Sequence, residues 1–96
     1  MKRVDQKHGN GTSLVGYLNI TYDELVEKFG KSDGKSSDNK CKAQWCFSHN
    51  GTIITIYDWK MYTTPLRDIT DWHIGGHSKK AVEILRIQGF DAVNDN

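Results

Sequence analysis

The segment Cys41–Trp59, CKAQWCFSHNGTIITIYDW, contains two runs of strand-forming residues on either side of Asn50-Gly51 and is the strongest indication of the fold. Asn-Gly between two such runs is the strongest short signal for a two-residue β-hairpin turn of type I′. The turn fixes which residues of the two strands lie opposite each other. This register predicts a core face of Trp45, Phe47, Ile54 and Ile56, and an opposite face of Gln44, Cys46, Thr55 and Tyr57.

The segment before the hairpin predicts one strand and one helix. Residues 13–20, SLVGYLNI, are rich in strand formers. Thr21-Tyr-Asp-Glu24 then fits a capping box, in which the Thr hydroxyl and the Glu carboxylate each accept a backbone N–H of the first turn. We expect a helix that starts here and ends at Gly30, where glycine can adopt the left-handed conformation. Residues 31–40 are polar and aperiodic, which predicts a surface loop.

The segment after the hairpin predicts a connection, a strand and a second helix. Residues 60–68 contain the only proline and are typical of a connection. Residues 69–74 alternate in polarity, which indicates a strand antiparallel to one of the earlier strands. Ser78 is the expected N-cap of a helix from Lys79 to about Gln88, and Gly89 is expected to end it.

The order of these elements is β-α-β-β-β-α, which predicts an α+β fold with a mainly antiparallel sheet and two helices on one face. A chain of 96 residues with 36% hydrophobic content supports one small core. We place this single domain at residues 13–90. Residues 1–12 show no periodicity and are expected to form a mobile arm or loop, and residues 91–96 are expected to form a tail.

The charge balance and the apolar content restrict the partners. The 13 Lys and Arg residues against 12 Asp and Glu residues give a formal net charge of +1, so no strong field attracts nucleic acid. No segment approaches the roughly 20 apolar residues of a membrane helix, and the N-terminus has no apolar signal region. We expect a cytoplasmic protein whose partners include neither a membrane nor nucleic acid.

The cysteines and histidines do not form a recognisable metal site. Cys41 and Cys46 are separated by an odd number of positions within one expected strand, so their side chains should point to opposite faces. A disulfide between them is then geometrically excluded, and we expect two free thiols. His73 and His77 would need a third ligand, and no spacing in the sequence supplies it. We therefore expect no metal and no cofactor.

Asp58 is the carboxylate expected to point inward, because it shares the parity of the core residue Ile56. A buried carboxylate needs hydrogen-bond donors, and we expect it to clamp the connection at residues 60–68. A role as an acid or base would need a partner in a cleft, and the sequence contains no recognisable nucleophile or catalytic triad. We expect a protein that is not an enzyme.

Three blocks of sequence resemble a known group of proteins. The blocks are Tyr22–Gly30 (YDELVEKFG), Thr55–Lys60 (TIYDWK) and Trp72–Gly76 (WHIGG), preceded by Gly16-Tyr17. In this order they resemble a family of short proteins encoded by bacteriophages, over about residues 13–90. The resemblance implies a small cytosolic phage protein that acts on host defence, by blocking a protein or by sequestering a signal molecule. It implies no catalytic residues.

Aromatic side chains form the first candidate binding site. A core of this size is not expected to hold every aromatic ring, so several should lie exposed on the sheet face opposite the helices. Tyr, Trp and Arg dominate protein-binding hot spots. The candidate residues are Tyr57, Trp59, Tyr62, Arg67 and Trp72. The alternative is that these aromatic side chains pack on the connection at residues 60–68.

The second candidate site is the glycine-rich segment before the last helix, which consists of Gly75, Gly76, His77, Ser78, Lys79 and Lys80. Lys79 and Lys80 in the first turn oppose the helix dipole by about 0.3 kcal/mol or more each. An anion bound to the free backbone N–H groups would compensate for this cost. The alternative is a purely structural turn between a strand and a helix.

These observations favour a non-enzymatic, anti-CRISPR-like counter-defence inhibitor that binds a host defence protein in the host cytoplasm. The alternative is a protein that sequesters a nucleotide or another phosphate-bearing signal at Gly75–Lys80. The near-neutral charge disfavours a strong anion trap, so the protein partner is the leading hypothesis.

Overall fold

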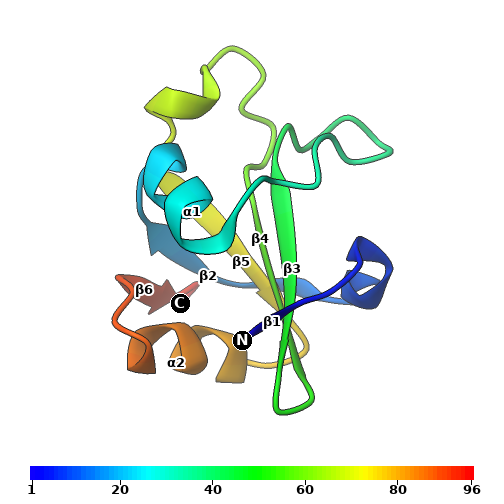
Figure 1. The fold of residues 1–96 in the computed structure, drawn as a ribbon, viewed down its shortest axis with the longest axis vertical. Helices are drawn as coiled ribbons and strands as arrows, with labels where there is room; N and C mark the ends of the chain where they lie inside the picture. Colours follow the sequence, from blue (N-terminus) through cyan, green and yellow to red (C-terminus); the bar gives the residue numbers. More distant parts are fainter.

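The computed structural model describes residues 1–96 and contains the expected β-α-β-β-β-α series (Figure 1). The elements of that series are β2 (Ser13–Asn19), α1 (Tyr22–Phe29), β3 (Gln44–His49), β4 (Thr52–Tyr57), β5 (Asp71–Gly76) and α2 (Lys80–Ile87). The chain also forms two short strands, β1 (Lys2–Arg3) and β6 (Ala92–Asn94), and two 3-10 turns, η1 (Gln6–Gly9) and η2 (Leu66–Asp68). The α+β class is confirmed.

The strands form one six-stranded sheet in the order β1-β3-β4-β5-β2-β6, and all neighbouring pairs are antiparallel. β5 lies between β4 and β2 and pairs with both. The predicted hairpin register is confirmed, because Trp45 lies opposite Ile56. Asn50 and Gly51 have φ values of 49° and 84°, as a type I′ turn requires.

A single core lies between the sheet and the two helices, which cover the same face (Figure 1). Leu25 of α1 and Leu85 of α2 are fully buried in the same cluster as the strand residues. At the centre, Trp45 and Trp72 pack edge to face with ring centroids 5.6 Å apart. Neither helix has the length and apolar character that a membrane crossing requires.

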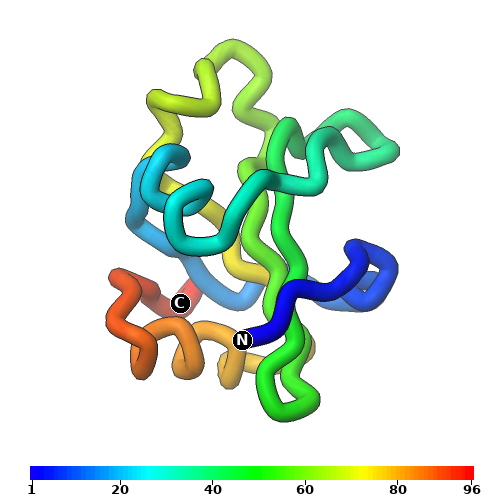
Figure 2. The backbone as a smooth tube through the Cα atoms, viewed as in Figure 1, coloured from blue at the N-terminus to red at the C-terminus, as the bar shows by residue number.

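Residues 1–12 are packed on the sheet, so the prediction of a mobile arm or loop is wrong for this segment (Figure 2). Arg3 pairs with Phe47 of β3. Its guanidinium donates to the Phe29 carbonyl at 2.9 Å and to the Lys31 carbonyl at 2.8 Å. The last carbonyl groups of a helix have no partner within the helix, and Arg3 supplies one for α1. A two-residue strand has no periodicity, so the sequence pattern could not reveal it.

Residues 91–96 are also part of the fold, so the prediction of a tail is wrong. β6 pairs with β2 and buries Ala92 against the core. The Lys79 ammonium donates to Asp95 Oδ1 at 2.5 Å and to Asn96 Oδ1 at 2.9 Å. β6 covers an edge of β2 that would otherwise be open to another chain. Its three residues are too few to show an alternating pattern.

Asp58 is fully buried, as predicted, but it holds a different segment. Its Oδ1 accepts hydrogen bonds from the backbone N–H groups of Lys42 at 2.8 Å and Ala43 at 3.0 Å. It therefore clamps the chain just before β3 and not the connection at residues 60–68. That connection is tied to the same place by a hydrogen bond from the Lys42 ammonium to the Thr64 carbonyl.

The two cysteines are free, as predicted, although Cys41 lies before β3 and not in it. Both are buried, and burial raises the pKa of each thiol from 9.0 to about 11. The thiolate is the reactive form of cysteine, and raising the pKa removes it at neutral pH. Both thiols are therefore poor nucleophiles in the folded protein.

We expect a thiol reagent at neutral pH to label Cys41 and Cys46 only after the protein unfolds, which mass spectrometry can measure. Unfolded thiols lose their protons near pH 9 and folded ones near pH 11, so the free energy of unfolding should decrease as the pH rises between these values. Fast labelling of the folded protein would contradict the burial of these thiols. A disulfide between them would contradict their separate positions.

Candidate functional site

The sheet face opposite the helices carries a row of aromatic side chains. Tyr57 of β4 lies opposite His73 of β5, and His73 lies opposite Tyr17 of β2. The ring centroids of Tyr57 and His73 are 5.4 Å apart, and those of Tyr17 and His73 are 5.3 Å apart, both edge to face. We call Tyr57, His73 and Tyr17 the aromatic row. Residues along a strand alternate between faces, so this row points away from the core.

The aromatic row presents uncharged polar groups. Burial lowers the pKa of His73 below its usual value, and the carboxylates of Asp71 and Asp58 only partly oppose this effect. The imidazole is therefore neutral at neutral pH and offers one donor and one acceptor. Burial also raises the pKa of Tyr57, which keeps its phenol group protonated.

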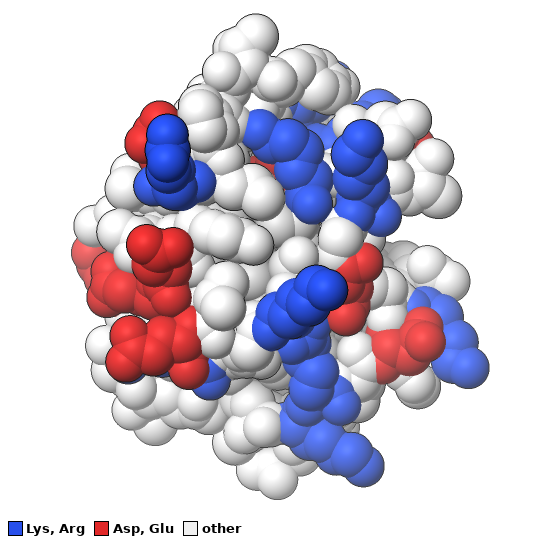
Figure 3. Space-filling view, turned by 45° about the horizontal axis from the view of Figure 1, so that its top comes forward, with Lys and Arg blue, Asp and Glu red and all other residues white.

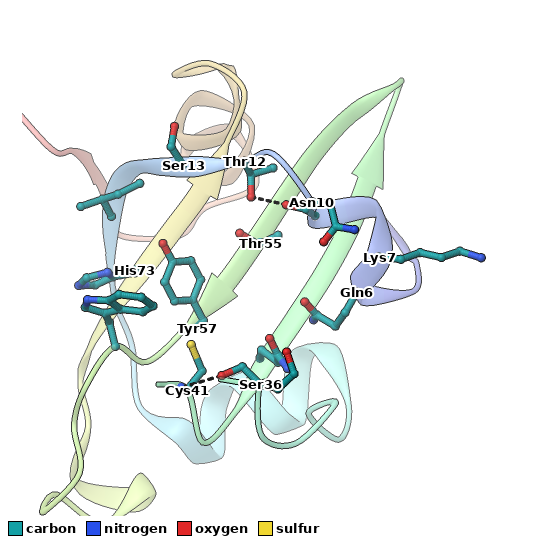
Figure 4. A pocket seen from close by; sticks show the side chains of 15 residues that line it. Gln6, Lys7, Asn10, Thr12, Ser13, Ser36, Cys41, Thr55, Tyr57 and His73 are labelled. Carbon is teal, nitrogen blue, oxygen red and sulfur yellow. Dashed lines mark hydrogen bonds between the residues drawn. The ribbon is translucent and has the colours of Figure 1, made fainter. Parts of the chain in front are cut away.

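A groove of about 810 Å³ lies beside the aromatic row (Figure 4). Its walls are the N-terminal segment around η1 and the loop at residues 36–41, and Thr55 and Tyr57 lie between them. Hydroxyl and amide side chains dominate the lining, which contains no carboxylate. Lys7 is the only charged lining residue, and Figure 4 shows its side chain pointing away from the groove. The groove is therefore polar but nearly uncharged.

Trp59 lies at the rim of the groove and is 37% exposed. The ammonium groups of Lys40 and Lys60 lie over its ring, 5.5 Å and 5.6 Å from the centroid. The backbone N–H of Lys60 donates to the Lys40 carbonyl at 2.9 Å, which keeps both lysines beside the ring. Tyr62, in the following connection, is 63% exposed. We call Lys40, Trp59, Lys60 and Tyr62 the Trp59 patch.

Lys60 is held in a strained backbone conformation. Its φ of 55° lies in the left-handed region, which costs a residue other than glycine about 1 to 2 kcal/mol. Strained residues of this kind cluster at functional sites. The lysine at this position therefore lowers stability while it places a positive charge beside Trp59.

The structure separates the aromatic residues that the sequence grouped into one site. Tyr57 lines the groove, while Trp59 and Tyr62 are exposed at its rim and beyond it. Arg67 is exposed on η2. Trp72 is fully buried and its indole N–H donates to the Ile20 carbonyl at 3.0 Å, so its inclusion in an exposed site is wrong. Edge-to-face packing lets the small core hold both Trp45 and Trp72.

The segment from Gly75 to Lys80 has structural roles. Gly75 and Gly76 are buried residues of β5. A Cβ at Gly75 would lie 2.2 Å from Thr55 Oγ1, and one at Gly76 would lie 2.8 Å from the Ala81 Cβ, so both glycines allow close packing. The salt bridge from Lys79 to Asp95 supplies the compensation for positive charge at the helix start that the sequence did not reveal.

The start of α2 also differs from the prediction. Lys79, and not Ser78, is the N-cap residue, and the Ser78 hydroxyl accepts weakly from the Lys80 N–H at 3.3 Å. His77 and Lys80 are exposed, with His77 outside the aromatic row that holds His73. The two candidate metal ligands therefore lie in different surroundings.

Sequence reasoning missed Tyr17, His73 and the lining residues of the N-terminal segment as parts of one site. The pairing of β5 with both β2 and β4 brings the aromatic row together. The alternation of residues 69–74 puts His73 on the face opposite Trp72, and this is the signal that the sequence contains. The position of residues 6–13 over the sheet had no signal in the sequence.

Charged side chains are distributed unevenly over the surface. Figure 3 shows one face, on which acidic side chains gather mainly along one side and Lys and Arg side chains lie across much of the remainder.

Comparisons with protein-family models, curated proteins and solved structures give no match. The groove, the aromatic row and the Trp59 patch are therefore the features that bear on function.

Proposed function

We propose that this protein is a non-enzymatic counter-defence inhibitor that binds a host defence protein through the Trp59 patch, in the host cytoplasm. The resemblance of its three sequence blocks to short phage proteins motivates the biological role, which is anti-CRISPR-like in kind. The observation that carries the binding site is Trp59, which lies exposed with the ammonium groups of Lys40 and Lys60 over its ring.

The chemistry of the Trp59 patch favours a partner surface with acidic side chains around an apolar contact. Tryptophan and tyrosine supply large contact areas at binding hot spots. The cation–π contacts at an exposed ring are worth about 0.5 to 1 kcal/mol. Hydrogen bonds to charged groups are worth about 1.5 to 3 kcal/mol, so a partner carboxylate can draw the lysines from the ring. This exchange would expose the indole face to the partner.

Replacing Lys60 with glycine should separate stability from function. Glycine relieves the left-handed strain, so the free energy of unfolding should rise by about 1 kcal/mol. Loss of the ammonium group should weaken inhibition about 10-fold, as for a hot-spot residue that contributes between 1 and 2 kcal/mol. The measurements are thermal melting and the plating efficiency of a restricted phage on host cells that express this protein beside defined defence systems.

Asn39→Gly is the matched control, because Asn39 also has a positive φ, of 61°, and precedes Lys40 without contributing a charge. It should keep full inhibition and show an equal or smaller gain in stability. If Lys60→Gly inhibits as well as the unmodified protein, the Trp59 patch is not the binding site. If no defence system is inhibited by the unmodified protein, the counter-defence role itself is wrong.

A further inference from the structure

We propose that the groove beside the aromatic row binds a nucleoside, with the base against the aromatic end and the sugar along the hydroxyl-lined walls. The groove shares only the rim residue Trp59 with the Trp59 patch. Nucleoside binding in the groove does not require a protein partner. It also differs from the Gly75–Lys80 segment, which is filled by packing and by the salt bridge of Lys79.

The dimensions and polarity of the groove suit a small polar molecule. Its volume of about 810 Å³ lies within the range of roughly 300 to 1,000 Å³ that small-ligand sites occupy. Carboxylates are absent from the lining, and the one lysine points outward, so the groove selects neither a cation nor a strongly charged anion. The part of the ligand inside the groove is therefore neutral.

Several polar side chains of the groove are free to bind a ligand. Within the chain, the Gln6 amide donates to Asp33, the Thr12 hydroxyl donates to Gly9, and the Ser36 hydroxyl donates to Asp38. These bonds leave the Gln44 amide and the hydroxyl groups of Thr55 and Tyr57, all of which line the groove. The Thr55 hydroxyl has no hydrogen-bond partner within the chain and is not a buried atom, so a ligand group in the groove can bind it.

The aromatic end favours a planar heterocycle over a sugar alone. Trp59 stacks near-parallel to His73, with an angle of 25° between the rings and centroids 6.5 Å apart, and Tyr57 contacts both edge to face. Proteins hold unpaired bases by stacking on aromatic rings and by hydrogen bonds to the base edges. An amide such as that of Gln44 carries a donor and an acceptor side by side, which matches the edge of a base.

The test is isothermal titration calorimetry of the protein with adenosine, guanosine, cytidine and uridine, beside glucose and a ten-nucleotide single strand. We expect saturable binding of at least one nucleoside and none of glucose. Trp59 is the exposed tryptophan, whereas Trp45 and Trp72 are buried, so bound base should also quench the fluorescence of this one residue. Binding of glucose, of no nucleoside, or of the single strand more tightly than of any nucleoside would overturn the proposal.

Tyr57→Phe keeps the ring and removes the hydroxyl, and it should weaken nucleoside binding about 3- to 10-fold, as expected for one neutral hydrogen bond. Tyr22→Phe makes the same chemical change on the other side of the sheet, where Tyr22 packs against Trp45 and Trp72, and should leave binding unchanged. Equal binding by both variants would remove Tyr57 from the site and overturn the proposal. Inhibition that survives in Tyr57→Phe but not in Lys60→Gly would separate this groove from the Trp59 patch.

Discussion

Replacing Trp45 with alanine should lower the free energy of unfolding by about 3 to 5 kcal/mol, the usual cost of truncating a core aromatic residue. The Trp45 side chain is fully buried, packs edge to face with Trp72, and donates from its indole N–H to the Gly30 carbonyl at 2.9 Å. The substitution therefore removes packing and a helix-end hydrogen bond together. A small domain has only about 5 to 15 kcal/mol in total, so the variant should be partly unfolded at 37 °C.

Gln44→Ala is the control for this prediction, because Gln44 precedes Trp45 in β3 and faces the groove. It should change the free energy of unfolding by less than about 0.5 kcal/mol, as surface substitutions do. Urea denaturation followed by circular dichroism measures both variants. Similar losses from the two substitutions would mean that Trp45 does not face the core.

Local signals in the sequence predicted the elements well where short-range chemistry determines them. Asn50-Gly51 specified the turn, and the turn specified the partner of every residue in β3 and β4. The Thr21 hydroxyl accepts from the Glu24 N–H at 3.2 Å, and the Glu24 carboxylate reaches back to the Thr21 N–H, so the predicted capping box is present. In each case the deciding contacts lie within a few residues of one another.

The candidate site was harder to predict, because segments far apart in the sequence form it. Residues 6–13 and residues 36–41 make the two walls of the groove, and the strands that lie between them come from the middle of the chain. β1 and β6 are too short to show periodicity, so the sequence could not place the segments that they anchor. The core is also larger than the number of aromatic residues suggested, because Trp72 fits inside it.

The sequence also identified some residues of the Trp59 patch and missed others. The sequence placed Trp59 and Tyr62 in the candidate aromatic site because a small core was not expected to hold every aromatic ring, and both side chains are exposed. It did not identify Lys40, whose carbonyl binds the Lys60 N–H across a separation of 20 residues. The positive φ of Lys60 is likewise a property of the folded chain that no propensity scale assigns to lysine.

Gly16→Ala should lower the free energy of unfolding by about 3 kcal/mol, because overpacking of a filled interior is costly. Only Trp45→Ala is expected to cost more. A Cβ at Gly16 would lie 2.3 Å from the Val93 carbonyl oxygen and 2.6 Å from Val82 Cγ2. Displacing either neighbour would lower the stability of the fold. Val93 is fixed by the pairing of β6 with β2, and Val82 of α2 is fully buried in the core.

The expected structural result is that β6 separates from β2. The Asp95 N–H donates to the Val15 carbonyl at 3.1 Å, and this bond should open, because Asp95 directly follows the strand that is displaced. Hydrogen exchange of the Asp95 amide should therefore become faster in Gly16→Ala, while amides of the β3–β4 hairpin remain protected. Urea denaturation measures the total loss of stability.

Gly34→Ala separates crowding from backbone strain. Gly34 has a φ of 80° and no atom within 4 Å of an added Cβ, so its substitution should cost only the left-handed strain of about 1 to 2 kcal/mol. Gly16 has no positive φ, and its loss of stability must come from close contact alone. If Gly16→Ala is as stable as the unmodified protein, the close approach of β6 to β2 is wrong, and residues 91–96 are the tail that their sequence suggests.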